Sequence, residues 1–267
     1  MADIHPELGR IFDDADVDEL FGPLHVAGHV PAPEGYSARG YSSSMDDAPV
    51  IDPSEYDARI DEQERLKSRI SDRMSWRATD QGRYPTCWAA GTCHAFTTAR
   101  ALAGQSIEFL SPMSVAVPIS GGNSGGYEGD AVEWLIKQGG VRESLWGPQD
   151  RRRVSGPAID QDRERLRIVD AYECTRPEHF KTACLLGWPC TVAYAAWSHV
   201  VMLCDFVRIE PGSYGFRIRN NWGDSWGDKN RHSVGGFAVF REGARIGAPS
   251  SGFAIRSVKQ AWIQDAA

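Results

Sequence analysis

The segment Asp80-Gln81-Gly82-Arg83-Tyr84-Pro85-Thr86-Cys87-Trp88 places a glutamine six residues before a cysteine. The apolar run over residues 88–102 predicts a buried helix, and Pro85 suits its approach because proline cannot occupy a helix interior. We therefore expect Cys87 at a helix N-terminus, where unpaired backbone N–H groups and the helix dipole stabilise negative charge. A cysteine is nucleophilic only as the thiolate, so this position favours a reactive thiol.

A histidine and an asparagine of complementary chemistry lie further along the chain. His199 follows Cys87 by 112 residues and precedes a Val-rich strand pattern, and Asn220 heads a segment with two Trp-Gly pairs. We expect His199 to form an ion pair with the thiolate and to protonate a leaving amine, while Asn220 holds the imidazole in place. Gln81 would direct its side-chain NH₂ at a developing oxyanion, beside the backbone N–H of Cys87.

These four positions resemble the papain-like cysteine peptidases, the C1-type family, from about residue 76 to the C-terminus. The resemblance implies an α+β fold of two lobes, with the cysteine on a helical lobe and the histidine and asparagine on an antiparallel β lobe. It implies that Gly125 and Gly126 pair with the backbone of an extended substrate, because close backbone approach leaves no room for a side chain. It also implies that Trp222 and Trp226 shield the contact between His199 and Asn220.

The resemblance also points to a specificity pocket. Glu128 follows the glycine pair at a position that, in the family, looks into the pocket for the second residue before the cut. An acidic side chain there would favour lysine or arginine in the substrate. Trp197, just before His199, is expected to wall the same region.

The chain departs from the family at one disulfide. The usual Cys-Gly-Ser before the nucleophile reads Tyr84-Pro85-Thr86, and the position expected for the partner cysteine reads Asn123-Ser124. With Cys87 kept as a thiol, five of the six cysteines remain, so at least one more must be free. A disulfide scaffold is disfavoured, and a reducing compartment is expected.

Each of these residues alone has a structural interpretation. A cysteine in an Ala-rich helix and a histidine in a Val-rich strand are usually core residues, and Asn-Trp-Gly is usually a turn. The combination favours a cysteine endopeptidase that works through an acyl-thioester. Two alternatives stay open: a Cys–His acyltransferase or deamidase, and a scaffold or virion-type component of a bacterial or viral assembly that retains the fold.

Composition indicates which partners to expect. Residues 1–50 hold ten acidic and two basic residues, so they account for the chain's net charge of −7 and leave no basic patch for nucleic acid. A secretory signal and a membrane span are not expected, which suggests a cytoplasmic or particle-associated protein. No compact Cys/His cluster indicates a metal, and no cofactor is expected. The expected partner is a protein or peptide substrate.

The chain is expected to divide into three parts: an acidic, largely extended tail (1–50), a helical connecting segment (51–75) and the peptidase domain (76–267), with its helical lobe over about 76–165 and its β lobe over about 166–267. Asp52 and Pro53 predict a helix start, with Tyr56, Ile60, Leu66, Ile70 and Met74 as its buried stripe. Residues 11–21 resemble an acidic docking segment. For residues 1–70 we expect partner docking first and autoinhibition second.

Overall fold

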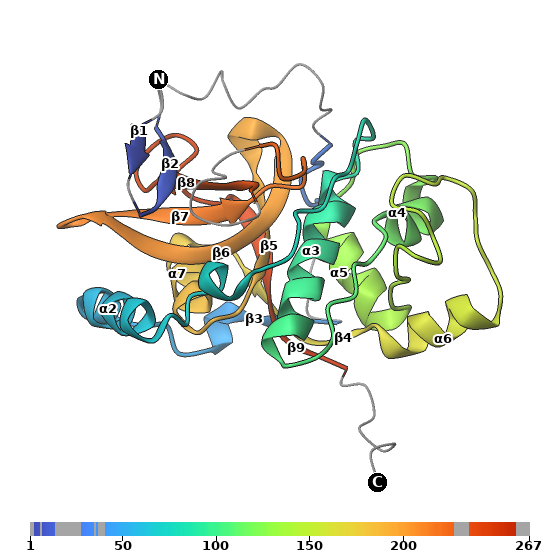
Figure 1. Cartoon of the computed structure of the whole chain (residues 1–267), viewed down its shortest axis with the longest axis horizontal. Coiled ribbons are helices and arrows are strands. Elements are labelled where there is room, and N and C mark those ends of the chain that lie inside the picture. Colours follow the sequence, from blue (N-terminus) through green and yellow to red (C-terminus); the bar gives the residue numbers. More distant parts are fainter. Residues whose placement is uncertain are drawn as a thin grey trace, which may run out of the picture.

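The computed structural model describes residues 3–5, 7–13, 28–34, 36, 41–226 and 235–259. Its α-helices are α2 (Tyr56–Leu66), α3 (Cys87–Leu102), α4 (Met113–Ser120), α5 (Glu128–Lys137), α6 (Pro157–Arg165) and α7 (Pro177–Leu185). Its strands are β1 (Asp3–His5), β2 (Gly9–Phe12), β3 (Ser43–Ser44), β4 (Ile168–Cys174), β5 (Cys190–Tyr194), β6 (His199–Glu210), β7 (Ser213–Arg219), β8 (Phe237–Arg241) and β9 (Ser251–Val258). Helices α3 to α6 lie on one side of the molecule, and β6, β7 and β8 lie on the other (Figure 1). The α+β arrangement expected from the sequence is confirmed.

The strands form one sheet in the order β1-β2-β8-β7-β6-β5-β9-β4-β3. Its central pairs, from β8 through β4, are antiparallel, as predicted. The N-terminal strands β2 and β3 add to its two ends in parallel, beside β8 and β4. The predicted antiparallel β lobe is confirmed, and short strands from far upstream extend the sheet at both edges.

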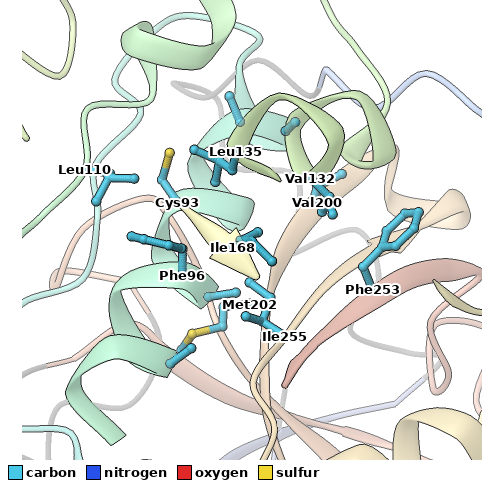
Figure 2. Close-up of a cluster of buried hydrophobic side chains, with 14 of the residues drawn as sticks. Cys93, Phe96, Leu110, Val132, Leu135, Ile168, Val200, Met202, Phe253 and Ile255 are labelled. Carbon is cyan, nitrogen blue, oxygen red and sulfur yellow. The ribbon is translucent and has the colours of Figure 1, made fainter. Parts of the chain in front are cut away.

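Helix α3 is the element that brings the two halves together. Its side chains are buried from Cys87 through Arg100, as expected for an apolar helix inside a core. Gly91 permits a close approach to β6, since a Cβ there would lie 3.1 Å from Val200 Cγ1. Figure 2 shows Cys93 and Phe96 of this helix within a cluster of apolar side chains contributed by α5 and by strands β4, β6 and β9. The packing holds the start of α3 against the start of β6.

The described parts of residues 1–50 contain more structure than an extended tail. Phe12 of β2 and Met45 are buried, and the Phe12 ring packs edge-on against Phe240 of β8 with centroids 5.8 Å apart. The remainder of the predicted docking segment, residues 14–21, lies outside the described residues. Composition did not reveal these contacts because they depend on strand pairing across the whole chain.

The connecting segment packs on the same core. Asp52 caps the helical segment by accepting from the Ser54 backbone N–H, as predicted, and Tyr56 and Ile60 are buried. The rest of the predicted stripe is wrong. Lys67 adopts a left-handed conformation that ends α2, so Leu66 is 53% exposed, and Ile70 and Met74 are buried beyond the helix.

The six cysteines are all unpaired and buried. Within the described residues, no helix is long and apolar enough to cross a membrane.

Candidate active site

Cys87 is the first residue of α3, as the sequence predicts, and its side chain is completely buried. Burial raises the pKa of the thiol to about 11, and hydrogen bonds from the backbone N–H groups of Val200, Gly28 and Trp88 oppose this effect. The Val200 contact brings the residue after His199 to the sulfur. Burial of the thiol therefore works against the low-pKa thiolate that the sequence predicts.

Asn220 fixes the orientation of the His199 imidazole. Its Oδ1 lies 2.8 Å from His199 Nε2 and also accepts from the backbone N–H of Asn221 at 2.8 Å. A backbone N–H can only donate, so the amide atom that faces it is the oxygen, and His199 Nε2 must then carry the proton of the shared bond. In a neutral imidazole of this tautomer, Nδ1 is the basic nitrogen.

Two indole rings enclose the imidazole. The ring centroids of Trp197 and Trp222 lie 4.5 and 4.6 Å from that of His199, and both rings are almost fully buried. Trp222 shields the histidine, as predicted. Trp197 packs edge-on against Trp222 and stacks on Trp226, so its ring contacts are with the histidine and the core. The place of Trp197 in the pocket of Glu128 stays a prediction, and the ring also supports the imidazole of His199.

Gln81 is positioned by the second asparagine of the pair. Asn221 Nδ2 donates to Gln81 Oε1 at 2.9 Å and to the Cys87 carbonyl at 3.4 Å, and the Gln81 backbone N–H donates to the Asn221 carbonyl. Gln81 Nε2 donates one hydrogen to the Tyr84 carbonyl at 2.9 Å. The role of Gln81 as an oxyanion donor stays a prediction. This contact of Asn221 with Gln81 was not predicted from the sequence.

An upstream segment of the chain lies against the glycine pair. The Val30 backbone N–H donates to the Gly126 carbonyl at 3.0 Å, the Gly126 N–H donates to the Gly28 carbonyl at 2.8 Å, and the His29 N–H donates to the Ser198 carbonyl at 3.1 Å. Residues 28–30 therefore bridge both sides of the site in extended form, parallel to Gly126. Gly126 makes the backbone pairing expected of it, but with the chain's own segment.

Gly28 packs closely against both Pro85 and Gly125. A Cβ at this position would come within 2.2 Å of the Pro85 carbonyl oxygen, and a Cβ on Gly125 would come within 2.6 Å of the Gly28 carbonyl oxygen. Both glycines are needed for this contact. Because the Gly28 N–H donates to the Cys87 sulfur, the segment presents a donor to the thiol where a substrate would present a carbonyl carbon.

Glu128 begins α5 with its side chain fully buried. Its Oε1 accepts a hydrogen bond from Ser251 Oγ, and its Oε2 lies 3.4 Å from His29 Nε2. Glu128 therefore faces the side chain of His29, which belongs to residues 28–30. The pocket prediction expects a substrate side chain in that place. Sequence reasoning missed Ser251 and His29, because each reaches the pocket from a distant part of the chain.

The described residues include no group of three or more His, Cys, Asp or Glu side chains that could hold a metal ion. The site consists of a thiol, an imidazole, two amides and backbone donors. Its chemistry is that of proton transfer and nucleophilic attack.

Solved structures of cysteine proteases have a similar fold. The chain is similar to xylellain, a cysteine protease from Xylella fastidiosa, at 16% identity and a TM-score of 0.62 over 90% of this chain and 99% of that one. It is similar to digestive procathepsin L2 of Tenebrio molitor at 16% identity and a TM-score of 0.58, over 90% and 86% of the two chains.

Bromelain from Ananas comosus, solved with the E64 inhibitor, matches at 17% identity and a TM-score of 0.56, over 69% of this chain and 95% of that one. No protein-family model and no curated protein sequence matches the chain. At these identities the likeness defines the fold.

Proposed function

We propose that the protein is a cysteine endopeptidase that hydrolyses peptide bonds through an acyl-thioester on Cys87. One observation carries this proposal: Cys87 lies at the N-terminus of a helix beside the start of β6, and the imidazole of His199 on that strand is oriented by Asn220. Thiol, base and orienting group are the three parts that acyl transfer needs.

In the first half of the reaction, the thiol proton passes to His199 Nδ1, and the sulfur attacks the substrate carbonyl carbon. The oxyanion accepts hydrogen bonds from the Gln81 NH₂ and the Cys87 backbone N–H. The C–N bond then breaks, and the imidazolium returns its proton to the leaving amine. Asn220 keeps the ring in plane because its oxygen accepts from Nε2 throughout.

In the second half, water replaces the amine. Nδ1 removes a proton from the water as it attacks the thioester carbon, the C–S bond breaks, and the thiolate recovers the proton. The net products are a carboxylic acid and an amine, with one water consumed. An acyltransferase would use an amine in place of this water, and a deamidase would attack a glutamine side chain.

We further propose that residues 28–30 keep the enzyme latent. The segment takes the backbone hydrogen bonds of Gly126 and places the Gly28 N–H on the Cys87 sulfur, so a substrate cannot bind there while the segment is in place. Because it offers the Gly28 N–H to the sulfur, it blocks the site without being aligned for cleavage. We therefore propose autoinhibition, in place of the docking expected first, for residues 28–30, and docking stays a proposal for the acidic residues nearer the N-terminus.

Hydrolysis of a quenched fluorescent peptide library tests the peptidase function, with Cys87→Ala and Cys87→Ser as inactive variants and Cys93→Ala as the matched control. Cys93 is a buried residue of the same helix whose thiol lies in an apolar cluster and donates to the Ser111 carbonyl. We expect both Cys87 variants to lose turnover and Cys93→Ala to keep it. Mass spectrometry with and without added amine separates hydrolysis from acyl transfer, because the acyl group is then found on water or on the amine. Turnover that survives Cys87→Ala rules out the proposal.

A further inference from the structure

Arg219 is a fully buried arginine that joins three segments of the chain beside the site. Its guanidinium donates from Nη2 to the Trp76 carbonyl at 2.5 Å and from Nε to the Gly235 carbonyl at 3.3 Å. Nη2 also lies 3.4 Å from Asp224 Oδ1. Burial lowers the pKa of Arg219 to about 10, so the side chain stays charged at neutral pH. A buried charge is costly unless it is paired and hydrogen-bonded, and these acceptors meet that need.

Residues 76–81, here called the approach segment, form no helix or strand of their own. Backbone of this kind is held by individual hydrogen bonds, because it lacks a ladder that would satisfy its N–H and C=O groups. Arg219 supplies one of these bonds, to the Trp76 carbonyl. Its partner Asp224 supplies another, since Asp224 Oδ1 accepts from the Ala78 backbone N–H at 2.8 Å. The ion pair of Arg219 and Asp224 therefore holds the first half of the segment.

The far end of the approach segment carries Gln81 into the site. The Gly223 backbone N–H donates to the Thr79 carbonyl at 3.0 Å, and the Gln81 N–H donates to the Asn221 carbonyl at 2.9 Å. The segment is thus attached along its length to residues 219–224. Because the chain between the two ends is only a few residues long, a shift at its start is passed on to Gln81.

Asn220 depends less on the arginine side chain. Its backbone N–H donates to the Gly236 carbonyl at 2.8 Å, and the preceding residue, Arg219, pairs with Phe237 where β7 meets β8. These backbone contacts remain when the side chain of Arg219 is shortened. Loss of the guanidinium should therefore displace Gln81 more than it displaces Asn220.

We propose, resting on the peptidase function above, that Arg219 is a positioning residue for the oxyanion donor: it holds the approach segment where the Gln81 NH₂ can donate to the oxyanion. Arg219 acts through Gln81, and its own guanidinium is directed at the backbone carbonyls of the approach segment and of Gly235. An oxyanion donor contributes mainly in the transition state. A displaced Gln81 should therefore lower kcat and leave KM nearly unchanged.

Steady-state hydrolysis of one fluorogenic peptide by the full chain tests this role in Arg219→Met, Gln81→Ala and the double variant. Residues 28–30 compete with the peptide and so raise KM, but saturating peptide removes their effect on kcat. We expect Arg219→Met to lower kcat about 10-fold and Gln81→Ala about 100-fold, with KM within about threefold. In the double variant, Arg219→Met should cost less than about twofold beyond Gln81→Ala, because residues that act as one unit are not additive.

Three further variants separate positioning from a loss of stability. Asp224→Ala removes an acceptor of both Arg219 and the Ala78 N–H, and its side chain is 38% exposed, so it should fold and also lower kcat. Arg219→Lys keeps the charge without the planar fork of donors, so it should restore kcat only in part. Arg100→Met is the matched control, because Arg100 is equally buried and pairs with Glu108 near the end of α3. It should lower the free energy of unfolding and leave kcat unchanged.

The side-chain NH₂ of Gln81 gives a readout that does not depend on the reaction. Its proton signals in ¹H–¹⁵N NMR spectra are identified by their absence from Gln81→Ala. They should move toward the positions of free glutamine in Arg219→Met and Asp224→Ala, and stay in place in Arg100→Met. Such movement in a protein that hydrolyses no peptide supports the positioning role and refutes the peptidase.

Hydrolysis with an unaltered kcat in Arg219→Met would refute the positioning role and leave the peptidase intact. The same conclusion follows if the losses of Arg219→Met and Gln81→Ala multiply in the double variant, since Arg219 would then act independently of Gln81.

Discussion

His199 Nε2 and Asn220 Oδ1 lie 2.8 Å apart at neighbouring strand ends, with His199 opening β6 and Asn220 directly following β7. The register places Arg219, the last residue of β7, opposite Met202, so the antiparallel pairing of the two strands brings the two side chains together. The pairing of β6 with β7 therefore creates this contact. Because the contact keeps the proton on Nε2, Nδ1 is the basic nitrogen of the imidazole.

The first prediction concerns the two adjacent asparagines. Asn220→Ala should lower kcat/KM by about 10- to 100-fold, less than the loss of the acid–base group itself, because it orients His199 without transferring a proton. Asn221→Ala should lower kcat through Gln81, its partner at 2.9 Å. Only Asn220→Ala should move the pH dependence of kcat/KM. If the pH dependence shifts in Asn221→Ala and not in Asn220→Ala, then Asn221 orients His199 and the prediction is contradicted.

The second prediction concerns latency. Gly28→Ala adds a methyl group that would lie 2.2 Å from the Pro85 carbonyl oxygen. This oxygen belongs to the backbone, so it cannot move aside as a flexible side chain would. The clash exists only while the segment is inserted, so the variant should expel it and raise peptide hydrolysis. Val30→Ala is the control, because its side chain is 48% exposed and its backbone bond to Gly126 is kept. Equal hydrolysis by Gly28→Ala, Val30→Ala and the unaltered chain would contradict the latency proposal.

The third prediction concerns alkaline stability. Burial raises the pKa of Cys87 to about 11 and that of Cys174 to about 12, and it raises the pKa of the other four thiols as well. A raised folded-state pKa means that stability is intact below the unfolded value near 9 and falls as pH rises above it.

Urea unfolding at several pH values between 8 and 11 measures this loss. Above the unfolded value near 9, each thiol that ionises only when unfolded costs about 1.4 kcal/mol per pH unit. Cys93→Ala should therefore reduce the slope of unfolding free energy against pH by about that amount, whatever it does to absolute stability. An identical slope in the variant would show that the Cys93 thiol is not protected from ionisation.

Sequence patterns predicted most of the elements that carry the site. The apolar run after Cys87 predicted α3, and the Val-rich stretch after His199 predicted β6. These elements have strong local signals, because burial on one or all faces imposes a periodicity on the residues. The resemblance then indicated which polar residues belong together.

What the sequence did not reveal depends on long-range pairing. Strand β2 joins β8 across more than 200 residues, and residues 28–30 reach Gly126 and Ser198 through backbone hydrogen bonds that leave no side-chain pattern. An acidic, proline-containing stretch reads locally as a tail. Gly28 and Cys87 meet only in the folded chain, where residues 28–30 cover the thiol that the sequence predicts to be reactive.

Mapping the six thiols with an epoxide that alkylates thiolates tests the central claim most directly. We expect Cys87 to react selectively in Gly28→Ala, to react far more slowly in the unaltered chain, and to give no adduct once Cys87→Ala is added to Gly28→Ala. The five other buried cysteines should stay unmodified in every folded form. Modification of all six at similar rates, or of another cysteine in preference to Cys87, would contradict the account.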